Sequence, residues 1–272
     1  MVGVTITALN GIRLSWTDHG GDGPPVVLVM GTGSPGRVWD VHQVPALRSA
    51  GHRVVTVDNR GIAPSDECAG GFTVADMAAD VAALIEHLGA GPAAVVGTSL
   101  GSRIVCELAL ARPDLVRRVA ALAAHARLSP VQRSYTAGLV AAADAGVELP
   151  VELWAAMQAT HNLSASTLDD DRAARDWLDV IGFGGSAVRP GHREQLRVSC
   201  DLGDRRAAYR GITVPLLVLA FADDRAIPVR LSREVADAVP GARYTEIADA
   251  GHYGYLERPA EVNRALVGFL AC

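Results

Sequence analysis

A serine placed between two glycines stands where a predicted strand meets a predicted helix. Residues 97–101 read Gly-Thr-Ser-Leu-Gly and follow the apolar stretch 92–96. A sharp turn at this point would hold Ser99 in a strained backbone conformation with its hydroxyl exposed, and Gly97 and Gly101, two positions away on each side, would relieve the crowding. A serine in such a turn is typical of an activated nucleophile. The pattern therefore requires a fold built from strand–turn–helix units.

The residues that could activate this serine follow in the second half of the chain. A buried strand predicted to end at Phe221 leads into an acidic loop with Asp223 and Asp224, and His252 follows after one more predicted helix and strand. Ser99, Asp224 and His252 thus occur in the order nucleophile, acid and base, unlike the orders found in chymotrypsin and subtilisin. An alternative remains open, in which Asp223 is the acid and Asp224 caps a helix.

Strands and helices alternate over most of the sequence. A strand pair turned at Asn10-Gly11 comes first. Further strands are predicted at 25–30, 53–58, 93–97, 117–124, 215–221 and 242–247, and helices at about 37–50, 74–88, 100–112, 230–239 and 259–271. The strands are near-continuous runs of Val, Leu and Ala, which indicates burial on both faces of a parallel sheet. The sequence therefore predicts the α/β class, with a mostly parallel central sheet flanked by helices.

The alternation stops between about 128 and 210. This part reads as helical pieces only, at 130–145, 150–161, 169–180 and 193–206, separated by glycine- and proline-containing breaks at 182–185 and 189–191. A helical insertion between two parallel strands has to lie above the carboxyl edge of the sheet, where such folds bind ligands. We therefore expect a core domain formed by 1–127 and 211–272, and a helical cap, or lid, inserted at about 128–210.

The glycine-rich segment 31–36 allows a different function. It matches Gly-x-Gly-x-x-Gly after a predicted strand, and Asp58 ends the next strand 22 residues after Gly36. This is the pattern of a dinucleotide-binding site, with the acid placed for a ribose hydroxyl, and it would make the chain an NAD(P)-dependent oxidoreductase. Two observations argue against a dinucleotide site. A strand pair precedes the strand that would have to be the first of such a domain, and Pro35 places a stiff residue next to the glycine that must allow close helix packing. In the other interpretation, the segment is a glycine loop beside an oxyanion site. This interpretation also explains Ser99, Asp224 and His252, which the dinucleotide site leaves without a role.

Composition removes several classes of function. The formal net charge is −5, and all 25 basic residues are arginines scattered along the chain, so no basic stripe offers a surface for nucleic acid. The absence of lysine excludes Schiff-base chemistry and a Walker-type phosphate loop. No apolar run approaches the ~20 residues of a membrane span, and residues 1–10 lack the pattern of a secretory leader. We expect no membrane association and a cytoplasmic location.

The four cysteines, Cys68, Cys106, Cys200 and Cys272, lie far apart and include no Cys-x-x-Cys pair. This spacing favours free thiols in a reducing compartment over disulfides or metal ligation. We expect no metal site.

Five ordered motifs together resemble the α/β-hydrolase superfamily over nearly the whole chain. They are Met30-Gly31-Thr32 with Trp39, Asp58-Asn59-Arg60-Gly61 with Ser65, residues 97–101, Asp224 with Pro228, and Gly251-His252 followed by Leu256-Glu257-Arg258-Pro259. The nearest group contains small-molecule esterases, cofactor-free haloperoxidase-like hydrolases and carbon–carbon bond hydrolases. The chain departs from that group's pattern at Met30, where histidine is frequent, and at Ala63, Ser102 and Phe221, where glycine is common.

The resemblance implies a serine hydrolase that uses no cofactor and no metal. The nucleophile, base and acid would be Ser99, His252 and Asp224, and the backbone N–H groups that hold the oxyanion would be those of Thr32 and Leu100. Asp224 stands four residues before Pro228, as in the family pattern. Serine, and not aspartate, at the nucleophile position disfavours the haloalkane dehalogenase and epoxide hydrolase variants of this fold.

The expected substrate is an ester, lactone, thioester or activated ketone of a small, mainly apolar molecule. Candidates for substrate contacts are Trp39, Trp154, Met157 and Trp177, whereas His125, Asp58 and Arg60 are expected to have non-catalytic roles. A second class of function stays open, a non-hydrolytic cyclase or ligand-binding protein on the same fold. The sequence also leaves open whether the chain forms a homo-oligomer.

Overall fold

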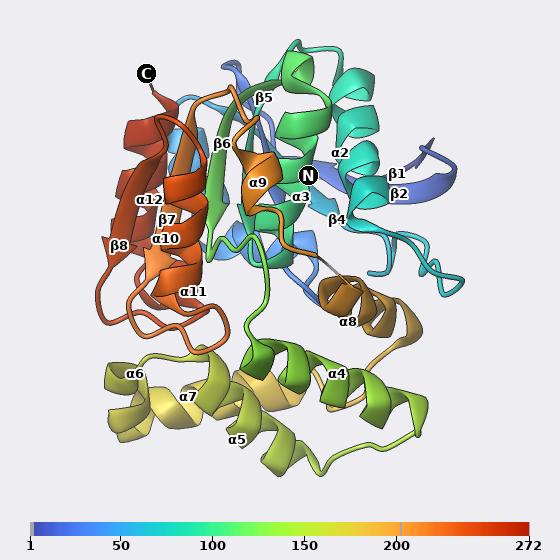
Figure 1. Ribbon diagram of the computed structural model, residues 1–272, viewed down its shortest axis with the longest axis vertical. Coiled ribbons are helices and arrows are strands. Elements are labelled where there is room, and N and C mark those ends of the chain that lie inside the picture. The colour runs from blue at the N-terminus through green and yellow to red at the C-terminus, as the bar shows by residue number, and fades with distance from the viewer. Residues whose placement is uncertain (1–2, 202, 272) are drawn as a thin grey trace.

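An eight-stranded sheet runs through the computed structural model, which describes residues 3–201 and 203–271 (Figure 1). The strands are β1 (Val4–Leu9), β2 (Ile12–Asp18), β3 (Pro25–Val29), β4 (Arg53–Asp58), β5 (Ala93–Thr98), β6 (Val116–Leu122), β7 (Leu216–Phe221) and β8 (Arg243–Ile247). Their order in the sheet is β1-β2-β4-β3-β5-β6-β7-β8. Strands β1 and β2 form an antiparallel hairpin that pairs antiparallel with β4, and all the remaining pairs are parallel. The predicted α/β class and mostly parallel sheet are confirmed.

The central strands are buried on both faces, as their apolar sequences predict. In β3, Val26 and Leu28 belong to one hydrophobic core, and Val27 and Val29 belong to the other. This alternation follows from the two-residue period of a strand, which sends successive side chains to opposite faces. Both faces must therefore be covered by helices.

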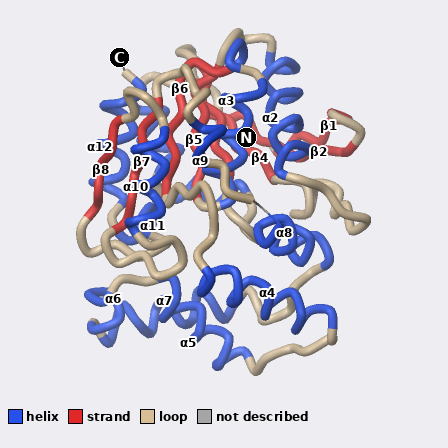
Figure 2. The backbone as a smooth tube through the Cα atoms, in the orientation of Figure 1, coloured by secondary structure: helices blue, strands red, loops and turns tan. Residues whose placement is uncertain are grey.

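Helices on both faces of the sheet provide this cover. The longer core helices are α1 (Gln43–Ser49), α2 (Val74–Leu88), α3 (Leu100–Ala111), α10 (Val229–Ala238) and α12 (Pro259–Leu270), and the short ones are η1 (Gly36–Val41), η2 (Pro113–Leu115), α9 (Arg206–Tyr209) and α11 (Gly254–Glu257). Met77 of α2 and Ile104 of α3 pack into the core that contains Val27 and Val29. Leu47 of α1 and Leu266 of α12 pack into the core that contains Val26 and Leu28. The sheet thus lies between two helical layers (Figure 2).

Helices α4 to α8 lie beyond the carboxyl ends of the strands (Figure 1). They are α4 (Pro130–Asp144), α5 (Val151–Asn162), α6 (Ala165–Asp169), α7 (Asp171–Phe183) and α8 (Pro190–Asp201), and we call them the cap helices. The chain enters them from β6 and returns through α9 to β7. They occupy the position expected for a helical insertion, at the edge of the sheet where ligands of α/β folds bind.

Two helix predictions need correction. The helix expected at 37–50 is divided into η1 and α1 at His42, because Pro45 has no N–H for a continuous helix and is accommodated in the first turn of α1. The break expected at 189–191 ends earlier, at Arg189, because Pro190 begins α8, where a proline is well tolerated. The helix expected at 193–206 is also too long, because α8 ends at Asp201 and residues 203–205 are not helical.

Among the described helices, none is both long and apolar enough to cross a bilayer. Cys68, Cys106 and Cys200 are free thiols, and Cys272 lies outside the described residues.

Candidate active site

Ser99 lies at the turn between β5 and α3, with φ 56° and ψ −118°. A residue with a side chain seldom adopts this conformation, and such strain is concentrated at functional sites. The Ser99 amide donates a hydrogen bond to the carbonyl of Leu122 in the neighbouring strand at 3.0 Å. Although Ser99 is the N-cap residue of α3, its side chain makes no capping hydrogen bond. The hydroxyl is therefore not used to stabilise the helix.

The two glycines of the motif are required by close backbone contacts. A Cβ atom on Gly97 would lie 2.2 Å from the carbonyl oxygen of Gly101. A Cβ atom on Gly101 would lie 2.3 Å from the carbonyl oxygen of Val29. Since contacts this short do not occur, the turn and its packing against β3 depend on glycine at both positions. The crowding is of backbone against backbone, and no side-chain movement could relieve it.

His252 and Asp224 form a direct contact. Nδ1 of His252 lies 2.8 Å from Oδ2 of Asp224, whose side chain is fully buried, while the imidazole keeps some exposure. Oδ1 of Asp224 accepts a hydrogen bond from the Ile227 amide at 2.7 Å. The carboxylate is therefore held from both sides, and it fixes the ring so that Nε2 is the nitrogen left for other partners.

Asp223 faces a different part of the molecule. Its carboxylate accepts a hydrogen bond from the Ala165 amide, at the start of α6, at 3.3 Å. Its own amide donates to the carbonyl of Ala250 at 2.9 Å. Of the two successive aspartates, Asp224 is the one that contacts His252.

The candidate nucleophile, acid and base share one edge of the sheet. Ser99 follows β5, Asp224 follows β7 and His252 follows β8, each at the carboxyl end of its strand. His125 follows β6, between them in the sheet order, and its Nδ1 lies 3.3 Å from the carbonyl oxygen of Ala123. Burial, assisted by the nearby Arg103, holds the pKa of His125 well below its usual range, so this imidazole is neutral.

The glycine-rich segment lies directly against the candidate nucleophile. A Cβ atom on Gly31 would be 3.1 Å from Cβ of Ser99 and 3.2 Å from the carbonyl oxygen of Thr98. Thr32 is the next residue, in the turn closed by a hydrogen bond from the Ser34 amide to the carbonyl of Gly31 at 3.4 Å. Leu100 begins α3, where amide groups have no acceptor within the helix. The two predicted oxyanion donors thus belong to the residue after Ser99 and to the glycine-rich segment that packs beside it.

The position of Asp58 argues against a dinucleotide site in the glycine-rich segment. Its Oδ1 accepts a hydrogen bond from the Gly36 amide at 2.7 Å, and its Oδ2 accepts one from the Ser15 hydroxyl at 2.8 Å. Both oxygens therefore bind groups of the protein itself, in β2 and η1, and are not directed at a ribose. Arg60 is likewise engaged, in a buried ion pair with Asp80.

The four predicted substrate contacts fall into two groups. Trp39 is fully buried in the core, with its ring centre 5.0 Å from that of Tyr255. Trp154 and Met157 of α5 and Trp177 of α7 are half-buried. Trp177 stacks on Tyr253, the residue after His252, with ring centres 6.0 Å apart. Only the cap-helix residues have exposed surface that a substrate could contact.

The sequence does not predict that polar residues of the cap helices lie near His252. His161 of α5 stacks on Tyr135 of α4 with ring centres 4.2 Å apart, and the Tyr135 hydroxyl accepts a hydrogen bond from Gln158 at 3.1 Å. Burial lowers the pKa of His161 to about 4, with a smaller contribution from His252. A lone histidine on a predicted helix carries no motif, so the sequence offered no signal for this contact.

Glu257 ties the cap helices to the histidine loop. Its Oε1 accepts hydrogen bonds from the amide and hydroxyl of Ser164 and from the hydroxyl of Thr167, at 2.6–2.9 Å. Its Oε2 accepts one from the amide of Gly251, the residue before His252, at 2.8 Å. The cap segment that begins α6 and the loop that carries the candidate base are therefore held by one carboxylate.

This fold and this edge of the sheet define an α/β-hydrolase, and the chain belongs to that family. The family model described as the alpha/beta hydrolase fold matches residues 24–259, so the chain is an enzyme of the α/β-hydrolase class. The chain is 44% identical to BpoC of Mycobacterium tuberculosis, a candidate non-heme bromoperoxidase, over 260 residues that cover 96% of this chain and 98% of that protein.

Solved structures agree with the sequence comparison. The crystal structure of BpoC superimposes with a TM-score of 0.90 at 42% identity and covers 95% of each chain. The enol-lactonase from Burkholderia xenovorans superimposes with a TM-score of 0.85 at 27% identity, covering 98% of this chain and 100% of that one. The predicted membership of the α/β-hydrolase superfamily is thereby confirmed.

Proposed function

We propose that the chain is a metal-independent serine hydrolase in which Ser99, His252 and Asp224 form the catalytic triad. The observation that carries the proposal is the 2.8 Å contact between His252 and the buried Asp224, at the sheet edge that also carries Ser99. A carboxylate on Nδ1 leaves Nε2 as the basic nitrogen, which is the form that a general base for a serine requires.

In the proposed reaction, His252 takes the proton of the Ser99 hydroxyl while the oxygen attacks an acyl carbon. The imidazolium that forms is stabilised by Asp224, and the oxyanion is held by the N–H groups of Thr32 and Leu100. His252 then gives its proton to the leaving group, the bond to that group breaks, and an acyl-enzyme remains. Water attacks the acyl-enzyme with His252 again as base, and the acid product leaves with Ser99 restored.

We further propose that the cap, at about 128–210, covers this site and sets the choice of substrate, while 1–127 and 211–272 supply the chemistry. Trp154, Met157 and Trp177 offer partly exposed apolar surface on the cap helices. The proposed substrates are esters, lactones, thioesters or activated ketones of small, mainly apolar molecules. The lactonase name of the Burkholderia xenovorans enzyme and the ester chemistry of a serine nucleophile both support this class.

Reaction with a fluorophosphonate probe tests the proposal. The wild-type protein should take up one probe at Ser99, because only a serine activated by a base attacks phosphorus at a useful rate. Ser99→Ala should abolish both the labelling and the hydrolysis of a p-nitrophenyl ester. A folded wild-type protein that takes up no probe and hydrolyses no activated ester at neutral pH would favour the cyclase or ligand-binding alternative instead. Measurable binding of NAD would favour the dinucleotide alternative.

The similarity to BpoC adds a second candidate activity, the oxidation of bromide. It is tested by following bromination of a diketone in the presence of hydrogen peroxide and bromide. Bromination by the wild type that disappears in Ser99→Ala would support this activity at the same site.

A further inference from the structure

The side chain of Gln195, on α8, connects two loops at the carboxyl edge of the sheet. Its Oε1 accepts a hydrogen bond from the Gly33 amide at 2.8 Å, and its Nε2 donates one to the Arg60 carbonyl at 2.8 Å. Gly33 belongs to the glycine-rich loop after β3, and Arg60 to the loop after β4. Gln195 itself is fully buried. A residue far along the chain, on a cap helix, therefore contacts the loop that carries the proposed oxyanion donor Thr32.

The two partners fix one orientation of the Gln195 side chain. A carboxamide has one acceptor oxygen and one donor nitrogen, and here the oxygen meets an N–H group while the nitrogen meets a carbonyl group. Turning the group by half a rotation would place oxygen against oxygen and N–H against N–H. In a buried site, where water cannot compensate, that arrangement would be costly. The Gly33 amide is thus held in one direction.

Close backbone packing sets the position of α8 on the two loops. A Cβ atom on Gly191 would lie 2.1 Å from the carbonyl oxygen of Gly61. A Cβ atom on Gly33 would lie 2.6 Å from Nε2 of His192, so the imidazole rests on the glycine loop. Gly191 and Gln195 are four residues apart and share one face of the helix. The face that includes Gly191 and Gln195 is therefore fitted against the loops after β3 and β4.

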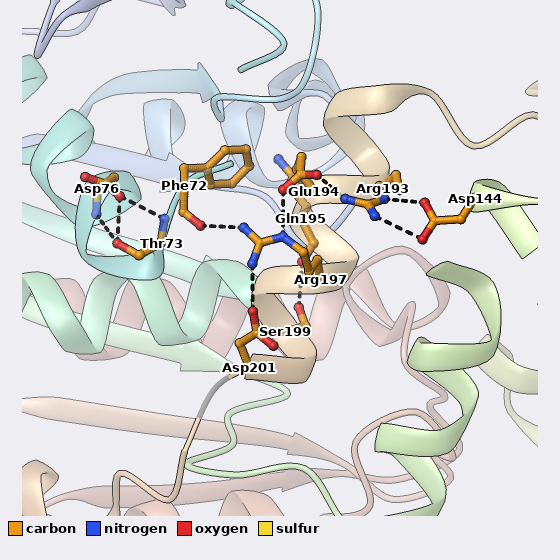
Figure 3. A network of polar contacts seen from close by, with 10 residues as sticks. All are labelled: Phe72, Thr73, Asp76, Asp144, Arg193, Glu194, Gln195, Arg197, Ser199 and Asp201. Atoms are coloured by element: carbon orange, nitrogen blue, oxygen red, sulfur yellow. Dashed lines mark hydrogen bonds and ion pairs between the residues drawn. The ribbon is translucent and has the colours of Figure 1, made fainter. Parts of the chain in front are cut away.

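A polar network holds the remainder of α8 (Figure 3). Arg193 pairs with Asp144, the last residue of α4, at 2.8 Å. Arg197 pairs with Asp201 at 2.7 Å and donates a hydrogen bond to the carbonyl of Phe72, before α2, at 3.4 Å. Helix α8 is thus joined both to the cap helix α4 and to the core.

Anchoring Gly33 restricts the amide of Thr32. The Gly33 N–H belongs to the peptide group that follows Thr32, and the Thr32 N–H belongs to the peptide group that precedes it. Because each peptide group is planar, only the two backbone dihedrals of Thr32 relate them. On the other side, Gly31 packs so close to Ser99 and Thr98 that an added Cβ atom would lie 3.1 Å and 3.2 Å from them. The hydrogen bond at Gly33 and the close packing at Gly31 therefore restrict the direction of the Thr32 N–H from both sides.

We propose that Gln195 is a positioning residue for catalysis, which holds the glycine loop so that the Thr32 N–H is directed at the oxyanion. The proposal rests on the serine hydrolase function proposed above. It makes α8 a support of the oxyanion site as well as a part of the cap. Misplacement of a donor by about 1 Å can lower the rate by ~10²-fold, and loss of one oxyanion donor lowers it by ~10²–10³-fold.

The test compares Gln195→Met with the wild type. Methionine has a similar length and fills the buried space, but it makes neither hydrogen bond. With p-nitrophenyl butyrate, we expect kcat to fall by ~10–100-fold while KM changes by less than about threefold, because the loop acts on the transition state. The affinity for butylboronic acid, which forms a tetrahedral adduct with a serine, should fall by a similar factor. The pH dependence of kcat/KM should keep its shape, since His252 and Asp224 are untouched.

Val198→Ala is the matched control. Val198 lies on the same helix with its side chain in the core, so its truncation lowers the melting temperature without removing a contact to the glycine loop. It should keep the wild-type kcat and boronate affinity. Gln195→Met with a lowered melting temperature but wild-type kcat and boronate affinity would give Gln195 a structural role only and overturn the proposal.

Amide hydrogen exchange gives a second measurement that does not depend on a variant's folding. In the wild type, the Gly33 amide should be protected, because Gln195 accepts its hydrogen bond. Exchange of Gly33 as fast as in an unfolded peptide would overturn the proposal. Failure of the wild type to react with the fluorophosphonate would instead reject the serine hydrolase function, whatever Gln195 does. The two failures are thus distinguishable.

Discussion

Asp224 contacts His252 through one carboxylate oxygen and the Ile227 amide through the other, whereas Asp223 turns toward α6. The two aspartates are adjacent, but their side chains have different partners, His252 for Asp224 and the Ala165 amide for Asp223. Of the two, Asp224 is the one in contact with His252, and we expect it to orient the imidazole and support its positive charge during the proposed reaction.

Asp224→Asn should lower kcat by up to ~10⁴-fold, by analogy with the loss of orientation and charge in protease triads. Asp223→Asn removes only a neighbouring charge and a hydrogen bond to Ala165, so we expect a loss of about tenfold or less. The measurement is kcat for both variants on one activated ester, with folding checked by circular dichroism. A larger loss in Asp223→Asn would reverse the assignment.

Alanine at Gly101 should prevent formation of the turn at Ser99, because its Cβ would lie 2.3 Å from a backbone oxygen of β3. Overpacking typically costs about 1–3 kcal/mol and more where backbone cannot move. We expect a lower free energy of unfolding and no detectable esterase activity. Gly138→Ala on α4 is the control, since its Cβ would meet no atom within 4 Å. That variant should be as stable as the wild type or more stable by about 0.5–1 kcal/mol.

Alanine substitutions of Trp177 and Trp39 should have different effects, the first on the choice of substrate and the second on stability. Trp177→Ala should change the relative kcat/KM for esters of different acyl length, because Trp177 is half-buried and stacks on Tyr253 beside His252. Trp39→Ala should reduce stability by ~3–5 kcal/mol and lower activity on every ester alike, because Trp39 is buried in the core. Melting temperatures and kcat/KM for acetyl, butyryl and octanoyl esters check both. Equal losses for all esters in Trp177→Ala would show that this tryptophan does not select substrates.

Acid should destabilise the fold partly through His192. Burial lowers the pKa of His192 to about 4, whereas an unfolded histidine has a pKa of about 6.5. Between pH 6.5 and 4 the unfolded chain therefore binds a proton that the folded chain does not, so the free energy of unfolding falls as the pH falls through this range. His192→Asn should make the melting temperature less dependent on pH in this range. An unchanged pH dependence in His192→Asn would contradict this account.

The sequence predicted the parts of the site that depend on local backbone requirements. The glycines at 97 and 101 leave a pattern that can be read without a structure, and so do the apolar runs of the strands. Contacts of Gln195 and His161 left no such pattern, because they join segments far apart in the chain. Trp39 was a candidate for substrate contact because a tryptophan's size does not tell whether it lies in a core or lines a pocket. The sequence predicts a helix break at Pro190, because proline usually interrupts helices, but the first turn of a helix accepts proline and α8 begins there.

The hydrogen bonds of Glu257 bear on how this enzyme could be re-engineered. One carboxylate serves both the cap residues Ser164 and Thr167 and the loop before His252. A cap transplanted from a relative would therefore leave this carboxylate with unmatched partners unless it brought equivalent donors with it. In a chimaera of this enzyme, the cap and the loop that follows β8 should therefore be replaced together, from the same parent protein.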